Sequence, residues 1–408
     1  MSASTNSLQR RVDAFSNRLH KVKEQDLYFY LQQVDALDGA RVTIGGKSKV
    51  IFSSYSYLGL ITHPKINAAA NEATDEFGTG THGVRILAGT TKLHVELEKR
   101  MAEFMGTEDA IAFSSGFLAN VATIASLMGR GDAVICDRLS HASLVDGCRL
   151  SGAEFIWFEH NNLDDAQRIL ADAKDKYRGK LIIVDAVYSM DGDVAPVPEL
   201  IDLAKTYDAW LLVDEAHSLG VLGETGHGIQ EYFGLPNGAI DILTGSLSKT
   251  IPAVGGYAAG RSDFIAFLRH NARGFVFSAA LPPAATAAAR VAFDIMEEEQ
   301  WRIAKLRHNI AKFVGGLNEL GFNTLNTKSS VIPIVIGDEE TTLKITMLLH
   351  NDGIFICPIL PPAVPPKTCR LRANVLASHT DEDIDYALEA LERAGSKLGV
   401  ISARRRAG

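Results

Sequence analysis

The feature that most constrains the fold is a series of short apolar runs that begins near residue 109 and alternates with helical stretches. The runs are DAIAFSSG, DAVICDRLSH, EFIWFEHN, KLIIVDAVYSM, AWLLVDEAHS and DILTGSLSK. Near-continuous apolar strands separated by helices are typical of a parallel sheet that helices cover on both faces. The sequence therefore predicts an α/β fold with a mostly parallel central sheet.

The segments on either side of this region show different patterns. Residues 7–37 carry apolar residues at helical spacing among many charges, which predicts an amphipathic helix that packs on the body or on a partner subunit. After a helix-rich stretch, short strands are expected around SVIPIVIG and GIFICPIL. We therefore predict an N-terminal helical segment over residues 1–50, a large domain over 51–290 and a smaller α+β domain over 291–408.

Composition excludes several classes of function. The net charge of −8 argues against nucleic acid or an anionic membrane as the main partner. No apolar run approaches the roughly 20 residues of a membrane span, and the first residues lack the apolar core of a signal peptide, so we expect a cytosolic location. The four cysteines are scattered without a C-x-x-C pair, which predicts unpaired thiols and no metal site.

Polar residues follow the predicted strands at the points where they end. The clusters are Ser114-Ser115-Gly116, Asp137 to His141, Tyr188-Ser189, Asp214 to His217 and Ser246 to Lys249. In open parallel sheets, ligands bind outside the carboxyl ends of the strands. Five strand ends with reactive residue types are hard to explain by loop composition alone, so we expect a functional site at this edge.

Two motifs resemble nucleotide-binding patterns, and both fail on context. GTGTHG (residues 78–83) fits G-x-G-x-x-G, but it follows a helical stretch instead of a strand. VDEAHS (213–218) has the letters of a helicase motif, yet the nearest Walker A candidate has Arg41 where its first glycine belongs. A glycine-rich turn that lines a site is the better interpretation of the first motif.

The stretch GSLSKT, residues 245–250, allows two nucleophiles. Ser246 and Lys249 form the Ser-x-x-Lys pattern of serine acyl-enzymes, but the partner motifs S-D-N and K-T-G are absent from the chain. The alternative is a Schiff-base lysine, which holds an aldehyde cofactor such as pyridoxal phosphate. The other strand ends favour Lys249.

Pyridoxal phosphate requires a defined set of partners, and the strand ends supply one candidate for each. A carboxylate must face the ring nitrogen, and Asp214 ends the strand before the lysine. The phosphate requires N–H groups at a helix start and hydroxyls. The remaining candidates are His141 over the ring face, Ser189 and His217 at the ring hydroxyl, and Ser115, Gly116, Phe117 and Ser246 at the phosphate.

Taken singly, each of these residues has an ordinary structural explanation. A strand-end aspartate such as Asp214 is often a helix cap, and His141 or His217 alone is more often a satisfied structural residue. The serines alone are typical of turns. The joint spacing is what favours a cofactor site over these separate explanations.

Five motifs in order, CDRLSHASLVDG, VYSMDGDVAP, LLVDEAHSLGVLGETGHG, GSLSKT and SAALPP, resemble the α-oxoamine synthase family of pyridoxal-phosphate enzymes. The resemblance runs from about residue 50 to the C-terminus. It implies the aspartate-aminotransferase fold (fold type I) and a homodimer with active sites at the subunit interface. It also implies decarboxylative condensation of an amino acid with an acyl thioester, carried by CoA or by a carrier protein.

The resemblance also implies a role for individual residues. Lys249 holds the cofactor as a Schiff base and acts as the base, Asp214 binds the ring nitrogen, and His141 stacks on the ring. Arg372 in CRLRANV binds the substrate carboxylate, although alone it would be a surface ion pair. Ser278 is expected to reach the phosphate from the second subunit, and the family's frequent threonine after it is replaced by Ala279.

Two departures from the family pattern bear on the substrate. SSYSYLGL places Tyr55 and Ser56 beside the expected substrate site and is closest to the serine palmitoyltransferase form. Leu360 stands where some members have an arginine before P-P-x-x-P. Loss of that cation favours an uncharged or long acyl chain, condensed with glycine, alanine or serine, as in the serine palmitoyltransferase or the polyketide off-loading members of the family.

Three alternatives stay open at this point. Two relatives of the same family, 8-amino-7-oxononanoate synthase and 2-amino-3-ketobutyrate CoA ligase, use other acyl groups. A fold type I lyase or aldolase would share the cofactor site and differ in its chemistry. A non-enzymatic regulatory subunit is disfavoured because Lys249 is present.

Overall fold

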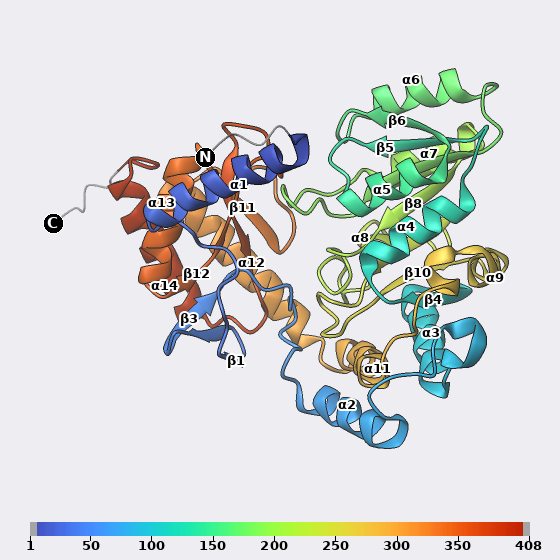
Figure 1. Ribbon diagram of the computed structural model, residues 1–408, viewed down its shortest axis with the longest axis horizontal. Coiled ribbons are helices and arrows are strands. Elements are labelled where there is room, and N and C mark those ends of the chain that lie inside the picture. Colours follow the sequence, from blue (N-terminus) through green and yellow to red (C-terminus); the bar gives the residue numbers. More distant parts are fainter. Residues whose placement is uncertain (1–5, 403–408) are drawn as a thin grey trace.

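A computed structural model describes residues 6–402. The first five residues of the predicted N-terminal segment and the last six of the predicted C-terminal domain lie outside the described residues. The structure contains three sheets, of four, seven and three strands, within that range. Figure 1 shows the large sheet with its helices on one side of the molecule and the smaller sheets with theirs on the other.

The central sheet has the order β4-β10-β9-β8-β7-β5-β6. Its strands are β4 (Asp109–Phe113), β5 (Ala133–Asp137), β6 (Glu154–Phe158), β7 (Lys180–Asp185), β8 (Trp210–Asp214), β9 (Ile242–Ser246) and β10 (Gly256–Gly260). All neighbours are parallel except β10, which is antiparallel to β4 and to β9. The predicted α/β class and mostly parallel sheet are confirmed, and each predicted apolar run contains one strand.

Strand β10 has no counterpart among the predicted runs. Its sequence, GYAAG, is short and consists mostly of small residues, so it lacks the β-branched signal of the other strands. Its first residue, Gly256, lies against Gly116, the first residue of the helix Gly116–Leu127 that packs on this sheet. A Cβ atom on Gly256 would lie 2.4 Å from the Gly116 Cα atom. The absence of a side chain therefore allows a helix start to rest directly on the sheet.

Helices cover both faces of the central sheet. Successive residues of β7 point to opposite faces, with Leu181 and Ile183 in one apolar cluster and Ile182 and Val184 in another. One face carries α4 (Gly116–Leu127), α5 (Ala142–Ser151), α9 (Ser262–Asn271) and α10 (Arg273–Val276). The other carries α2 (Pro64–Phe77), α3 (Lys92–Met105), α6 (Leu163–Ala173), α7 (Val197–Thr206), α8 (Ile229–Tyr232) and α11 (Pro283–Glu298), and a π-helical turn, η1, spans Arg85–Gly89.

The C-terminal part forms a smaller α+β unit, as expected. An antiparallel sheet has the order β11 (Val331–Gly337), β14 (Cys369–Asn374) and β13 (Cys357–Ile359). Its helices are α12 (Trp301–Leu320), α13 (Glu339–Asn351) and α14 (Asp381–Lys397). The boundary at residue 290 stays a prediction.

The prediction of helix over residues 7–37, and with it a helical segment to residue 50, is wrong in extent. Helix α1 (Ser7–Glu24) ends where Asp26 adopts a positive φ of 54°. Residues 36–51 form β1 (Ala36–Asp38), β2 (Arg41–Ile44) and β3 (Lys47–Ile51), with glycines of positive φ at both turns. Strand β3 pairs in parallel with β12 (Ile354–Phe355), so this region joins the C-terminal unit.

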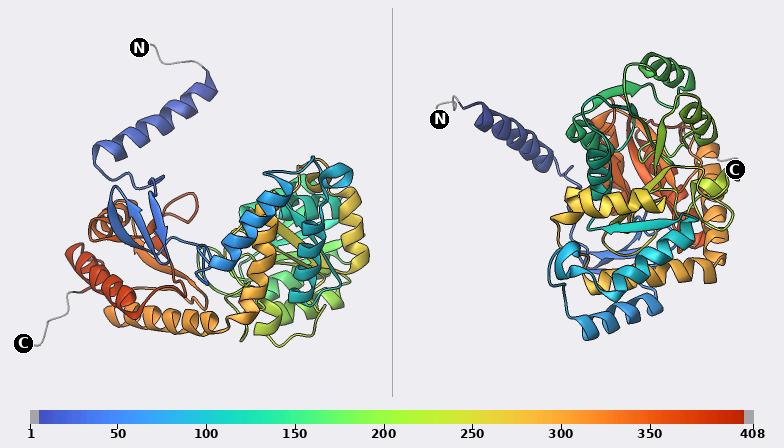
Figure 2. Two further views of the ribbon diagram at one scale, coloured as in Figure 1. Left: turned by 90° about the horizontal axis from the view of Figure 1, so that it is seen from below. Right: turned by 90° about the vertical axis from the view of Figure 1, so that its right-hand side faces the viewer.

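Helix α1 has no buried residue, and Figure 2 shows it projecting away from the rest of the chain. Its contact with the body includes an ion pair between Arg18 and Glu339 at 2.5 Å. The expected packing on the body is therefore not seen, and packing on a partner subunit stays a prediction. Within residues 6–402, no helix combines the length and the hydropathy that a membrane span requires.

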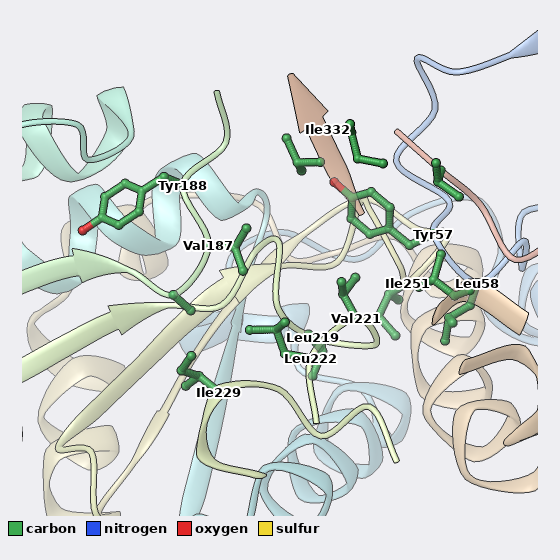
Figure 3. Close-up of a cluster of buried hydrophobic side chains, with 14 of the residues drawn as sticks. Tyr57, Leu58, Val187, Tyr188, Leu219, Val221, Leu222, Ile229, Ile251 and Ile332 are labelled. Carbon is green, nitrogen blue, oxygen red and sulfur yellow. The ribbon is translucent and has the colours of Figure 1, made fainter. Parts of the chain in front are cut away.

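The largest apolar cluster joins the two halves of the chain. It includes strand residues of the central sheet together with residues of β11, β14 and α14. Figure 3 shows part of it, with Tyr57 and Leu58, the segment from Leu219 to Leu222, and Ile332 of β11. Because these side chains come from both units, their packing holds the small unit against the carboxyl ends of the central strands.

Candidate active site

A pocket of about 340 Å³ opens at the carboxyl ends of the central strands. Residues from the ends of β4, β5, β7, β8 and β9 line it, together with one residue of β14 from the small unit. The lining residues are Tyr55, Ser115, Gly116, Phe117, Asn120, His141, Ser143, Asp185, Ser189, Met190, Asp214, Ala216, His217, Gly245, Ser246, Ser248, Lys249 and Arg372. The strand-end clusters in the sequence therefore meet in one place.

Two of the predicted site residues do not line this pocket. Ser56 is buried, and its hydroxyl oxygen accepts a hydrogen bond from the Ile61 N–H at 3.3 Å. Ser278 lies next to a β-bridge between Val84 and Ala279, in the same chain but away from the pocket lining. A substrate contact for Ser56 and a contact from Ser278 across a dimer stay predictions.

Lys249 lies in the turn after β9, with its side chain in the pocket. Desolvation lowers the pKa of its amine to about 8, and the positive charge of Arg372 acts in the same direction, while Asp214 and Asp185 oppose both. A neutral amine is therefore accessible near neutral pH. This is the form that attacks an aldehyde and that accepts a proton.

Asp214 ends β8 with a buried carboxylate. Its Oδ1 atom accepts a hydrogen bond from the Ala216 N–H at 2.9 Å, and its Oδ2 atom accepts one from Asn120 Nδ2 at 2.7 Å. These two bonds fix the carboxylate in the pocket wall. A fixed buried carboxylate is what the ring nitrogen of pyridoxal phosphate requires in order to stay protonated.

A second carboxyl group, Asp185, lies beside Asp214 at the end of β7. Burial raises the pKa of Asp185 well above its usual range, and the charge of Asp214 adds to this effect. Its Oδ2 atom accepts the backbone N–H of His141 at 3.0 Å. Asp185 therefore fixes the backbone at His141.

One end of the pocket is suited to a phosphate group. Ser115 is the N-cap of α4, and its hydroxyl oxygen accepts the Leu118 N–H at 3.1 Å. The backbone of Gly116 and Phe117 forms the first turn of this helix, whose N-terminus attracts anions. Ser246 and Ser248 place two hydroxyl groups 2.7 Å apart at the same end.

Two histidines line the middle of the pocket. Desolvation lowers the pKa of His141, and complete burial lowers the pKa of His217 further. Both rings are therefore neutral near pH 7. The Nδ1 atom of His217 lies 2.6 Å from the hydroxyl oxygen of Tyr57, and this hydrogen bond orients the ring.

Arg372 enters the pocket from β14 of the small unit. Its Nε atom donates to the carbonyl oxygen of Ser189 at 2.5 Å, and its guanidinium carbon lies 5.2 Å from the centre of the Tyr55 ring. Its Nη2 atom is buried and has no hydrogen-bond partner among residues 6–402. A buried cationic N–H without a partner is costly, so an anionic group such as a carboxylate is its expected ligand.

The sequence analysis did not single out five of the lining residues, namely Asn120, Ser143, Asp185, Met190 and Ser248, nor Tyr57, which contacts the lining residue His217. Two of them carried a usable signal. Asp185 ends an apolar strand just as Asp214 does, and Asn120 lies four residues after Gly116, on the same face of a helix. Tyr57 carried none, because its contact with His217 joins residues 160 positions apart.

The residues that line the pocket fit the chemical groups of pyridoxal phosphate. It holds an amine of lowered pKa, a fixed carboxylate, a helix start with two hydroxyls, and a guanidinium group whose buried Nη2 atom has no partner among the described residues. These groups match the aldehyde, ring nitrogen and phosphate of the cofactor and leave one cation for a substrate carboxylate.

Comparison with known proteins agrees with this chemistry. Residues 47–391 match the aminotransferase class I and II family. The chain is 43% identical over 390 residues to 8-amino-7-oxononanoate synthase of Thermoanaerobacter pseudethanolicus, with 96% of this chain and 98% of that protein covered. It is 41% identical to the enzyme of the same name from Geobacter sulfurreducens, with 95% and 99% covered.

Solved structures give the same result for the fold. Serine palmitoyltransferase from S. paucimobilis with a bound PLP–myriocin aldimine has a TM-score of 0.93 and 33% identity, covering 97% of this chain and all of that one. An 8-amino-7-oxononanoate synthase from Francisella tularensis has a TM-score of 0.72 and 26% identity, covering 86% and 98%. The predicted fold type I, cofactor and family are confirmed, and the relatives support a synthase over a lyase or an aldolase.

The activity therefore follows at the level of the family: the enzyme is a C-acyltransferase that uses pyridoxal 5'-phosphate, an amino acid and an acyl thioester. The chain belongs to the aminotransferase class I and II family, and within that family it is an α-oxoamine synthase.

Proposed function

We propose that the enzyme binds a small amino acid with its carboxylate on Arg372 and its α-carbon beside Lys249, and condenses it with an acyl thioester. The observation that carries this proposal is the unpaired Nη2 atom of Arg372 in the same pocket as the Lys249 amine and the Asp214 carboxylate. Ser189 supports the arginine because its carbonyl oxygen accepts the Nε–H.

Lys249 takes the α-proton of the bound amino acid, because desolvation lowers the pKa of its amine to about 8 and a neutral fraction that can accept a proton is then present near neutral pH. Bound pyridoxal phosphate supplies the electron sink that makes this proton acidic enough to remove. Asp214 would hold the ring nitrogen, and Ser189 and His217 the ring hydroxyl. Ser115, Gly116, Phe117 and Ser246 would hold the phosphate.

The carbon–carbon bond then forms between the α-carbon and the thioester carbonyl, the carbon–sulfur bond breaks, and the thiolate takes a proton. His141 lines the pocket and is neutral, so its free ring nitrogen is suited to donate to the oxygen of the reacting carbonyl. The resulting β-keto acid loses carbon dioxide from the carboxylate that Arg372 held, and the α-carbon takes up a proton in its place.

The first candidate for the acyl group comes from the relatives. In 8-amino-7-oxononanoate, the amine and the terminal methyl group lie beyond the ketone, so alanine supplies the last two carbons and a seven-carbon dicarboxylic acyl group supplies the rest. Relatives of that name match at 41–43% identity over nearly the full length. We therefore propose L-alanine and this dicarboxylic thioester as the first pair to test.

The second candidate is an uncharged or long acyl chain, which the sequence predicted as the main substrate. Leu360 supports it, because an apolar side chain stands where a cation would bind the distal carboxylate. The similarity to serine palmitoyltransferase, at a TM-score of 0.93, also favours it. The curated relatives support the dicarboxylic candidate better, so this one ranks second.

A matrix of glycine, alanine and serine against dicarboxylic and alkyl thioesters, on CoA and on a carrier protein, tests both candidates. The readouts are free thiol, carbon dioxide and product mass. Lys249→Ala is the control that must abolish all three. Turnover confined to alkyl thioesters would overturn the first candidate, and amino-acid cleavage without thiol release would overturn the condensation itself. The homodimer and the cytosolic location stay predictions.

A further inference from the structure

The side chain of His141 makes hydrogen bonds that fix the position of its proton. His141 is the N-cap of α5, and its Nδ1 atom accepts the backbone N–H of Ser143 at 3.3 Å. A backbone N–H can only donate, so Nδ1 must present a lone pair. In a neutral imidazole, the single proton then resides on Nε2.

A second contact points the same way. The Ser143 hydroxyl oxygen lies 2.7 Å from His141 Nδ1 and 2.9 Å from Asn120 Nδ2. The amide nitrogen of Asn120 also donates to the Asp214 carboxylate at 2.7 Å. An amide nitrogen only donates, so the Ser143 oxygen accepts from Asn120. Because Nδ1 presents a lone pair to the backbone N–H, the Ser143 hydroxyl is the donor in its contact with His141.

This arrangement is the one assignment of hydrogens that satisfies the whole series. Asn120 uses one N–H on Asp214 and the other on Ser143, and Ser143 uses its O–H on His141. Asn120 and Ser143 are both buried, so they approach the exposed His141 ring from the protein interior. The Nε2 atom of His141 has no hydrogen-bond partner in the part of the chain that the structure describes.

We propose that Asn120 and Ser143 are positioning residues, which fix His141 in the tautomer with its proton on Nε2 and so keep an N–H donor toward the pocket. What this N–H binds, the amino-acid carboxylate or the thioester oxygen, rests on the proposed function. The tautomer itself does not, because it follows from contacts within the protein.

A neutral ring with this tautomer suits the cofactor. Protonation of His141 would place a hydrogen on Nδ1, turn its contact with the Ser143 backbone N–H into a donor–donor contact, and require the Ser143 hydroxyl to change from donor to acceptor. Desolvation lowers the pKa of His141 in the same direction. The charged groups that face the ring are Asp214 on β8, which raises this pKa, and Lys249 and Arg372, which lower it. A neutral imidazole stacks on a protonated pyridine ring without charge repulsion.

The first test measures the tautomer directly. Holoenzyme with ¹⁵N-labelled histidine is compared with Ser143→Ala, and the His141 signals are assigned by their absence in His141→Gln. We expect a protonated Nε2 and an unprotonated Nδ1 in the parent enzyme. In Ser143→Ala we expect a mixture of the two tautomers, because the remaining bond from the backbone N–H is the longer one, at 3.3 Å against 2.7 Å for the lost hydroxyl contact. The matched control is Ser151→Ala, which removes a hydroxyl from the other end of the same helix.

The second test measures binding of the amino acid alone, by spectral titration without a thioester. Loss of one hydrogen bond corresponds to an affinity about twofold to tenfold lower in Ser143→Ala. Asn120→Ala removes the contacts to both Ser143 and Asp214, so we expect a larger loss and a weaker hold on the cofactor. Thr123→Val, one turn further along α4, is its control.

An Nδ1-protonated ring in the parent enzyme overturns the inference, as does Ser143→Ala with an unchanged tautomer. If the tautomer changes as expected but no amino acid and thioester pair turns over, the inference holds and the proposed function fails. The two outcomes are therefore distinguishable.

Discussion

The two walls of the active site are built in different ways. The wall from the central sheet consists of residues at the ends of neighbouring parallel strands, such as Asp214 and Ser246, each fixed by the backbone of its strand. The opposite wall comes from the small unit and the segment before α2, with Arg372 on β14 and Tyr55 in a loop. In the proposed function, the first wall holds the groups for the cofactor and the second holds the groups that meet the substrate.

This difference predicts different consequences of substitution. A change in the sheet wall should remove the chemistry for every substrate, because the same cofactor serves all of them. A change in the opposite wall should alter which amino acid or acyl group is used and leave the cofactor bound. Four experiments test this separation, in order of expected effect.

Lys249→Ala should abolish the imine absorption band and lower kcat by at least about 10²- to 10⁴-fold, the range of general acid–base catalysis. The physical reason is that no other amine lines the pocket within the described residues. The measurement is the visible spectrum of the purified protein together with thiol release. Lys249→Arg keeps the charge and should fail equally, and a retained band in either variant would contradict the assignment.

Arg372→Ala should raise the KM for the amino acid about tenfold to hundredfold, which corresponds to the loss of a charge-assisted hydrogen bond. The imine band should persist, because Arg372 belongs to the opposite wall. Steady-state kinetics at a fixed thioester concentration measures the effect. Arg372→Lys retains the charge without the planar guanidinium group, so its KM should lie between that of the parent enzyme and that of Arg372→Ala. Loss of the imine band in Arg372→Ala would show that Arg372 is also needed for cofactor binding, and it would contradict the separation of the two walls.

The rate at which the cofactor-free protein takes up pyridoxal phosphate should rise about tenfold per pH unit and level off above pH 8. The reason is that only the neutral amine attacks an aldehyde, and desolvation lowers the pKa of Lys249 to about 8. Growth of the imine band after rapid mixing measures this rate. The charge of Asp214 raises that pKa, so Asp214→Asn should shift the midpoint to lower pH. A midpoint near the ordinary lysine value would contradict the lowered pKa.

Leu360→Arg should produce the smallest change. We expect kcat/KM for a dicarboxylic thioester, relative to an alkyl thioester, to rise about threefold to tenfold, which corresponds to about one added hydrogen bond. The substitution restores a cation at a position where the sequence departs from its family. Competition between the two thioesters measures the ratio. Leu360→Gln, polar but uncharged, is the matched control. An unchanged ratio would place the acyl group elsewhere.

The sheet wall was predictable from the sequence because its signal is local. An apolar run followed by Asp214 or by Ser246 and Lys249 identifies a strand end, and parallel strands bring such ends together. The contact between Tyr57 and His217 depends on packing between distant segments, and no local pattern carries it. The prediction of a helical segment over residues 1–50 fails at residues 36–50, because charges mask the alternation of the short strands there.

The glycine pair at the start of α4 has a consequence for how this enzyme can change over time. Because Gly256 and Gly116 touch through their backbones, the distance from the phosphate end to the turn that carries Lys249 is set by main-chain atoms alone. Substitutions at the substrate wall leave that spacing intact, whereas a single methyl group on Gly256 would force the helix and the sheet apart. A bound cofactor would therefore span a spacing that substitutions at the opposite wall leave unchanged. Acyl specificity could then change without a change in cofactor binding.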